Sequence, residues 1–183
     1  MSQYKRNFEN GGTYFFIVVA YKRQKIFIGP SIDILRSCFK KAITEAPFTL
    51  EEIVVLPDHV HCIWRLPDGD NDFSTRWKKI KGDFSKGHQQ MIGTPEKMIS
   101  ESMKKKGESG IWQRRFWEHT IRDEHDFQAH CDYIHYNPVK HSYVQAPGEW
   151  PHSSFRRFVK AGLYDNSWGS MQSPELPENI GGE

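Results

Sequence analysis

A tight pair of strands in the first half of the sequence limits the possible folds of this chain more than any other feature. Residues 48–56 end in three apolar residues, and in residues 59–66 every second residue is apolar. Only Pro57 and Asp58, a dipeptide typical of turns, separate the two runs. Strands joined by so short a connection pair antiparallel. The chain is therefore expected to build an antiparallel sheet around this hairpin.

Further strands and helices are predicted on either side of the hairpin in the sequence. Residues 13–20 are aromatic and β-branched, as in a buried strand, and residues 111–121 are expected to form a strand or a bulged strand pair. Apolar residues recur at helical spacing in three segments, which are residues 31–46, 73–84 and 123–137. The order strand, helix, two strands, helix, strand, helix predicts an α+β domain. Its simplest form is a ferredoxin-like split βαβ arrangement with an antiparallel sheet and the helices packed on one face.

Polar residues mark the expected ends of the helices. Ser31 and Ser74 are expected N-caps of the first two. Asp123, together with Asp126, is expected to open the third, and Pro138 to end it.

Composition sets the expected domain limits and compartment. One domain is expected over residues 1–168, with a polar insertion at about 86–110 and a polar tail at 169–183. The three cysteines share no CxxC spacing, which argues against a disulfide framework or a zinc knuckle and fits a reducing cytoplasm. No apolar run approaches the length of a membrane span, so no membrane partner is expected.

Two histidines in the second strand of the hairpin are candidate metal ligands. His59 and His61 are two residues apart, so a regular strand places them on the same face, about 7 Å apart along the strand. Two imidazoles in this position suit a divalent cation, while Val60, Cys62 and Trp64 would pack in the core behind them. The alternative is a pair of solvent-facing histidines on an edge strand.

The third helix carries a polar face that includes a tyrosine. Asp126, His130, Tyr133 and Asn137 are spaced four, three and four residues apart, which places them on one side of a helix. This face is either the solvent side or part of a site. A tyrosine, whose ordinary pKa is about 10, attacks a phosphodiester effectively only where a cation polarises the phosphate. Asn137 is a candidate third ligand for such a cation.

The sequence around these residues resembles a known family. His59-Val60-His61 resembles the HUH motif (histidine, hydrophobic residue, histidine) of single-strand DNA nucleases and transposases. Together with residues 112–119 (WQRRFWEH) and 132–141 (DYIHYNPVKH), it makes the chain resemble the REP-associated tyrosine transposases of bacteria. The resemblance extends over residues 4 to about 168, and the three motifs together are specific.

This resemblance implies a mechanism. Mg²⁺ or Mn²⁺ would be bound by His59, His61 and Asn137, and Tyr133 would attack a DNA phosphate to leave a 5′-phosphotyrosine link and a free 3′-OH. The implied substrate is single-stranded DNA folded into a palindromic REP hairpin, which is cleaved and rejoined. A monomer in the cytoplasm, associated with the nucleoid, is expected. Tyr136 is close to Tyr133, so the choice between them rests on motif position.

Contacts to such DNA require cations for the phosphates and aromatic planes for unstacked bases. The candidates are Lys5, Arg6, Trp112, Arg114, Arg115 and Lys140. Each of these residues also has a structural interpretation.

Two other functions compete with this one. The first is a protein that binds hairpins without cleaving them. The second is a zinc-dependent hydrolase in which His130 or Cys62 joins His59 and His61 and in which Tyr133 has no role. Cys62 counts against the second alternative, because a regular strand turns it to the face opposite the histidines.

Overall fold

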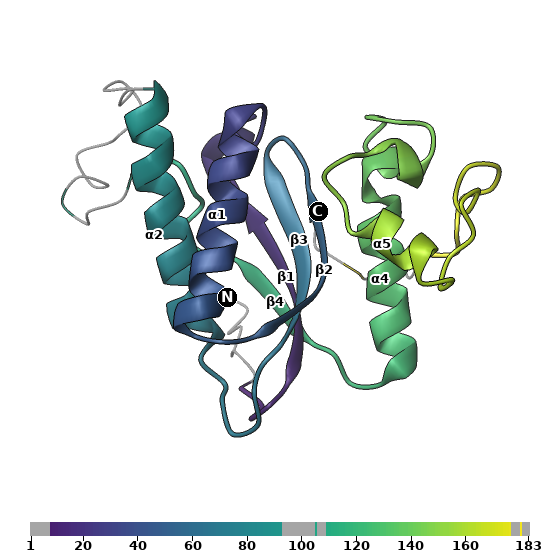
Figure 1. Cartoon of the computed structure of the whole chain (residues 1–183), viewed down its shortest axis with the longest axis horizontal. Coiled ribbons are helices and arrows are strands. Elements are labelled where there is room, and N and C mark those ends of the chain that lie inside the picture. Colours follow the sequence, from purple (N-terminus) through teal and green to yellow (C-terminus); the bar gives the residue numbers. More distant parts are fainter. Residues whose placement is uncertain (1–7, 93–104, 106–108, 177–179, 181–183) are drawn as a thin grey trace, which may run out of the picture.

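A four-stranded antiparallel sheet runs through the middle of the molecule (Figure 1). The computed structural model describes residues 8–92, 105, 109–176 and 180. The strand order is β2-β3-β1-β4, and each neighbouring pair is antiparallel. The strands are β1 (Thr13–Val19), β2 (Thr49–Val55), β3 (His59–Arg65) and β4 (Trp117–Thr120). The predicted α+β fold with a split βαβ arrangement is therefore confirmed, including the β2–β3 hairpin.

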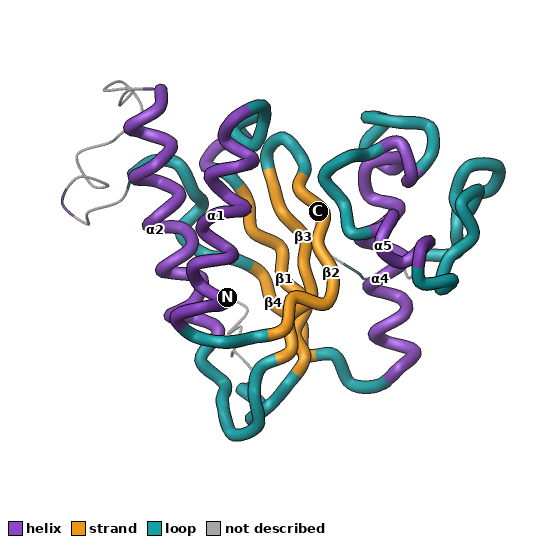
Figure 2. Tube along the Cα trace, viewed as in Figure 1, coloured by secondary structure: helices purple, strands orange, loops and turns teal. Residues whose placement is uncertain are grey.

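Helices cover both faces of this sheet. Helices α1 (Pro30–Glu45) and α2 (Phe73–Ile92) lie on one side, whereas α4 (Glu124–Lys140) and the short α5 (Phe155–Lys160) lie on the other (Figures 1 and 2). The prediction that all helices pack on one face is therefore wrong for the third long helix. Two single turns of 3₁₀ helix, η1 (Tyr21–Arg23) and η3 (Pro147–Glu149), complete the described elements.

The sheet separates two hydrophobic cores, which explains why both faces are covered. Phe16 and Val18 of β1 pack in the core beneath α1 and α2. Their neighbours Phe15 and Ile17 pack in the second core, with Ile134 of α4. A strand buried on both faces must have an apolar layer on each side. The continuous apolar run of residues 13–20 follows from this burial.

Three helix boundaries differ from the predicted ones. Helix α1 begins at Pro30, so Ser31 lies inside it and Gly29 is its N-cap. Before α2, Asp72 Oδ1 accepts a hydrogen bond from Thr75 N at 2.9 Å, and Ser74 is already helical. Helix α2 also runs to Ile92, so the predicted insertion begins as helix. The rest of that insertion, apart from residues 105, 109 and 110, lies outside the described residues.

Helix α4 starts as predicted but ends later. The Asp123 side chain accepts a hydrogen bond from Asp126 N at 2.8 Å, which confirms it as the N-cap. Pro138 was expected to end the helix, yet α4 continues to Lys140. Proline removes one hydrogen bond to the preceding turn and crowds that turn, but the following turn is intact, because His141 N donates to Asn137 O at 3.0 Å. This extra turn brings Lys140 and His141 towards the sheet.

The C-terminal segment returns to the sheet. Ser154 N donates to Ile53 O at 2.9 Å, and Val55 N donates to His152 O at 2.8 Å, so this segment lies along the outer edge of β2. Ile180, within the tail predicted for residues 169–183, is 8% exposed and packs in the second core. Within the described ranges, no helix has the length and apolar character that crossing a membrane needs.

Candidate metal and nucleophile site

The histidine pair on β3 is buried and faces α4. His59 is 1% exposed and His61 is 0% exposed, with their ring centroids 4.8 Å apart and their planes nearly perpendicular. The alternative of two solvent-facing histidines is therefore wrong. Val60, Cys62 and Trp64 pack in the core on the opposite face, as the period of a strand predicts.

Asp58 orients the first histidine. Its Oδ1 lies 2.6 Å from His59 Nδ1, and its Oδ2 accepts from Arg23 Nη1 at 3.4 Å. Burial raises the pKa of Asp58, but the hydrogen bond to His59 and the charge of Arg23 outweigh burial and lower it below its usual range. An ionised carboxylate accepts, so this shorter contact favours the tautomer with the proton on Nδ1 and with the metal-binding lone pair on Nε2, although Arg23 Nη1 also lies 3.3 Å from Nδ1. The sequence had indicated Asp58 only as a turn residue.

Helix α4 and its C-cap residue His141 lie across this pair. The Tyr133 ring centroid lies 5.3 Å from that of His61, and the His141 ring centroid lies 5.2 Å from that of His59. Asn137 is four residues from each of them, so it occupies the same helix face between two contacts with β3. Tyr133 and Asn137 are 2% and 1% exposed. The predicted metal and nucleophile residues therefore come together.

A buried pair holds α4 in this position. His135 Nε2, on a different side of the helix from Tyr133 and Asn137, lies 3.0 Å from Glu52 Oε2 of β2, and both side chains are 0% exposed. Further along the chain, the Tyr164 hydroxyl donates to Asp132 Oδ1. These contacts tie α4 to the sheet on one side and to the C-terminal segment on the other.

The side chain of Asn137 provides a test of whether these residues suit a cation. Both of its polar atoms, Oδ1 and Nδ2, are buried and have no hydrogen-bond partner among the described residues. Leaving a buried amide unpaired costs about 1–3 kcal/mol per polar group. A divalent cation between Asn137 and the two imidazoles would accept the lone pair of Oδ1. Two imidazole nitrogens and an amide oxygen also leave coordination positions for substrate oxygens, so the residues fit a catalytic cation.

Lys140 contacts Tyr133, the candidate nucleophile. Its Nζ donates a hydrogen bond to the Tyr133 hydroxyl at 3.3 Å and lies 4.7 Å from the centre of the Tyr133 ring. The sequence suggested Lys140 as a DNA contact, because phosphates require cations. The extra turn of α4 brings its ammonium group to the hydroxyl that would become negatively charged during attack.

Tyr136 occupies a different side of the same helix. Its hydroxyl lies 2.8 Å from Ser173 Oγ, and its ring packs edge-on at 6.3 Å from Trp168 in the C-terminal segment. Tyr133, by contrast, contacts the histidines. The geometry therefore distinguishes the two tyrosines, between which the sequence could choose only by motif position.

The remaining predicted DNA contacts are dispersed. Trp112 is 7% exposed and packs against Phe27 and Phe84, so its ring offers no open plane for a base and that prediction is wrong. Arg114 and Arg115 are exposed. Arg114 also borders a hollow beside α2 whose cationic lining is Lys78, Lys81, Lys86 and Arg114. Lys5 and Arg6 lie outside the described residues.

Neither Cys62 nor His130, the additional ligands of the zinc-hydrolase alternative, joins the His59 and His61 pair. Cys62 packs in the core on the other face of the sheet. The Nδ1 atom of His130 lies 2.7 Å from the backbone oxygen of Asp126, and the His130 ring stacks on His119 at 4.7 Å.

This fold and this site define a class of protein, and a family comparison identifies the class. Residues 10–137 match the family described as "Transposase IS200 like". The matched segment covers the whole sheet and includes His59, His61, Tyr133 and Asn137. The chain belongs to this transposase family.

The chain is also similar to individual members of this family. The chain is 41% identical over 168 residues to the REP-associated tyrosine transposase of Escherichia coli, with 92% of this chain and 91% of that one covered. It is 42% identical over 176 residues to a protein of Haemophilus influenzae provisionally given the same name, with 96% and 97% covered. A solved structure described as a REP-associated tyrosine transposase bound to a REP hairpin matches with a TM-score of 0.75 at 40% identity, over 98% of this chain and 99% of that one. The resemblance seen in the three sequence motifs is confirmed.

Proposed function

We propose that this chain is a metal-dependent single-strand DNA endonuclease and transposase that cleaves and rejoins DNA at palindromic REP hairpins. The observation that carries the proposal is the contact of the Tyr133 ring with His61, at 5.3 Å between centroids, inside a buried group of candidate ligands. Hairpin DNA is the proposed partner because the solved relative at 40% identity is described as bound to a REP hairpin.

The proposed cation ligands are His59 through Nε2, His61 and Asn137 through Oδ1. When bound, Mg²⁺ or Mn²⁺ polarises the scissile phosphate and stabilises the leaving 3′ oxygen. Asp58 keeps the His59 ring in the required orientation and tautomer through its 2.6 Å contact with Nδ1. Because both histidines are buried, competing water is restricted on the sheet side of the site.

Tyr133 is the proposed nucleophile. Its hydroxyl oxygen attacks phosphorus, the bond from phosphorus to the 3′ oxygen breaks, and the released oxygen takes a proton to become a 3′-OH. The phenolic proton leaves as the new ester forms. Lys140 Nζ, at 3.3 Å from the hydroxyl, stabilises the negative charge that develops on the phenolic oxygen. The number of phosphodiester bonds is conserved, so a second 3′-OH can reverse the step and join a new strand.

Hairpin recognition is proposed to use exposed cations beyond the reacting atoms. Arg114 and Arg115 are exposed just before β4, as phosphate contacts require. Lys5 and Arg6 remain candidates from the sequence. The expectation that the protein acts as a monomer also stays a prediction.

The test is to identify the residue that becomes linked to DNA. The full chain is incubated with a REP-type hairpin carrying a 3′ single-stranded extension, with Mg²⁺, Mn²⁺ or EDTA, and the adduct is digested and sequenced by mass spectrometry. We expect a phosphodiester on Tyr133 with either cation, and none in EDTA or in Tyr133→Phe. Tyr136→Phe is the matched control and keeps the adduct, because its hydroxyl faces Ser173.

Two results would contradict the proposal. Hairpin binding with no adduct under either cation would indicate a protein that binds without cleaving. Metal-dependent cleavage that persists in Tyr133→Phe would indicate a hydrolase that uses the histidines and a water molecule.

A further inference from the structure

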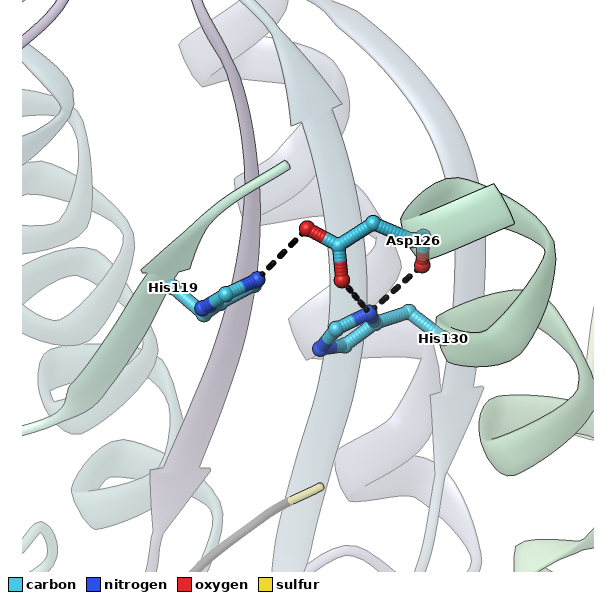
Figure 3. A group of neighbouring side chains, drawn as sticks. All are labelled: His119, Asp126 and His130. Atoms are coloured by element: carbon cyan, nitrogen blue, oxygen red, sulfur yellow. Dashed lines mark hydrogen bonds and ion pairs between the residues drawn. The ribbon is translucent and has the colours of Figure 1, made fainter. Parts of the chain in front are cut away.

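A second cluster of potential metal ligands lies at the start of α4, apart from the histidine pair of β3. It consists of His119 on β4 and of Asp126 and His130 on the first turns of α4 (Figure 3). Their ligand atoms all lie within 4.8 Å of one another. We propose that His119, Asp126 and His130 bind a Zn²⁺-class transition-metal ion that fastens β4 to the helix carrying the nucleophile.

The distances within the cluster suit one ion. His119 Nε2 lies 2.8 Å from Asp126 Oδ2, and His130 Nδ1 lies 3.2 Å from Asp126 Oδ1. Ligands ~2.0–2.1 Å from a tetrahedral zinc ion are ~3.3 Å from one another. A metal ion would replace the 2.7 Å contact between His130 Nδ1 and the backbone oxygen of Asp126, and rotations of the three side chains would then produce the coordination distances. Figure 3 shows the two rings and the carboxylate converging from β4 and α4.

The ligand types favour a transition metal over Mg²⁺. Two imidazoles and one carboxylate form a donor set that zinc sites use, whereas Mg²⁺ prefers oxygen ligands. Three protein ligands leave the fourth position for water. The His119 side chain is 24% exposed while that of His130 is 3% exposed, so the cluster is more open to solvent at His119 than at His130.

The surroundings hold the two rings in place. The His119 and His130 rings stack at 4.7 Å, Phe15 packs on His130 at 4.7 Å, and Trp117 stacks on His119 at 6.0 Å. Aromatic neighbours limit the rotations open to the two rings, which reduces the entropy lost when a metal binds.

One cation of the protein competes for the same carboxylate. Arg122 Nε donates to Asp126 Oδ2 at 3.3 Å, and Arg122 N donates to it at 3.0 Å. The Arg122 side chain is 74% exposed, so it can turn into solvent when a metal occupies Oδ2. The backbone hydrogen bond can remain and orient the carboxylate, as supporting hydrogen bonds do in metal sites.

Such an ion would fix the register of α4. His130 is three residues before Tyr133, and β4 pairs with β1, which also pairs with the metal-ligand strand β3. A metal link at the N-terminal end of α4 would therefore help to set the position of the Tyr133 ring relative to His61. Lys140 lies at the other end of this helix. This role is separate from the reaction and does not depend on the proposed cleavage chemistry.

The experiment measures metal stoichiometry. Full-length protein is stripped with a chelator, reloaded with Zn²⁺ and analysed by calorimetry and elemental analysis, with Co²⁺ absorption reporting on coordination geometry. We expect two sites per chain in the wild type and one each in His119→Gln and His61→Gln. His125→Gln, an exposed histidine on the same helix turn, is the matched control and keeps both. Any zinc still bound at the second site in His119→Gln should be held with an affinity at least about 10-fold lower, outside the concentration range in which the wild type fills both sites.

A different set of results would overturn the proposal. It is wrong if the wild type binds a single zinc ion that His61→Gln removes and His119→Gln leaves unchanged. Circular dichroism checks that each variant is folded. If His119→Gln does not fold, anomalous scattering at the zinc edge from wild-type crystals decides: a peak between His119, Asp126 and His130 supports the site, and its absence there in zinc-loaded crystals contradicts it.

Discussion

The contact between Lys140 and Tyr133 leads to the most discriminating prediction. Lys140→Met removes the ammonium that donates to the Tyr133 hydroxyl at 3.3 Å but keeps an unbranched side chain of similar length. Removing one well-placed donor to a developing oxyanion costs about 100- to 1,000-fold in rate, or about 2.7–4 kcal/mol. This hydrogen bond is long and Lys140 is exposed, so the loss of rate should be smaller than for a well-placed donor. We expect cleavage to slow by about 10- to 100-fold, or about 1.4–2.7 kcal/mol.

The assay must separate this role from DNA binding. Single-turnover cleavage of a labelled hairpin at saturating protein gives the rate of the chemical step, and hairpin affinity is measured in EDTA over a range of salt concentrations. Loss of one phosphate contact would reduce the slope of log K against log salt by about 0.7–0.9. We expect the rate to fall while the affinity and this slope stay unchanged.

Lys160 provides a matched control for Lys140. Lys160→Met removes an exposed lysine of α5 that no described hydrogen bond ties to the site, and it should leave both quantities unchanged. The reasoning is refuted if Lys140→Met cleaves at the wild-type rate once saturated. A slope reduced by a full phosphate contact, with the saturated rate intact, would restore Lys140 to the role of a DNA contact.

Three further changes test other parts of the structure. Asp58→Ala removes the acceptor for His59 Nδ1 and should weaken Mn²⁺ binding by about 10- to 100-fold in a calorimetric titration; affinity within twofold of wild type would contradict this. Trp77→Ala removes a fully buried ring whose centroid lies 4.5 Å from that of Trp64, and it should lower the free energy of urea unfolding by about 3–5 kcal/mol. A decrease of less than about 1 kcal/mol would disprove the packing role. Asp70→Asn should destabilise the fold by about 1–3 kcal/mol at pH 7, because Arg76 loses two charged hydrogen bonds.

The Asp70 prediction also has a defined pH dependence. The hydrogen bond from Arg76 holds the pKa of Asp70 below its usual range. A depressed folded-state pKa stabilises the protein above the unfolded pKa of about 3.9, and that stabilisation is lost as pH falls through the lower folded value. The difference in unfolding free energy between wild type and Asp70→Asn should therefore be full at pH 7 and shrink below about pH 4. A difference that stays constant down to pH 2 would show that the carboxylate charge has no part in it.

The periodicity of the strand and of the helix predicted the side-chain directions of most residues in the candidate site. Period two placed His59 and His61 together and turned Cys62 away, and a spacing of four placed Tyr133 and Asn137 on one face. These predictions succeeded because side-chain direction in a regular element depends only on position along it.

What the sequence did not supply was the relation between elements. The third helix was assigned to the wrong face, although the uninterrupted apolar run of β1 was a sign that both faces of the sheet are covered. His141 was missed because Pro138 was taken as the helix end. The pairing of His119 with Asp126 depends on how β4 leads into α4, and neither spacing nor composition encodes that path. Trp112 was misassigned because an indole next to arginines suits a core as well as a DNA surface.

A crystal structure of Tyr133→Phe with a REP-type hairpin and Mn²⁺ tests most directly whether metal and nucleophile act on one phosphate. We predict a manganese anomalous peak between His59, His61 and Asn137, with a DNA phosphate bound to it and its phosphorus about 3–3.5 Å from where the Tyr133 hydroxyl would lie. A hairpin whose phosphate binds the metal but points away from position 133, or one bound wholly on the α1 and α2 face, would contradict the account.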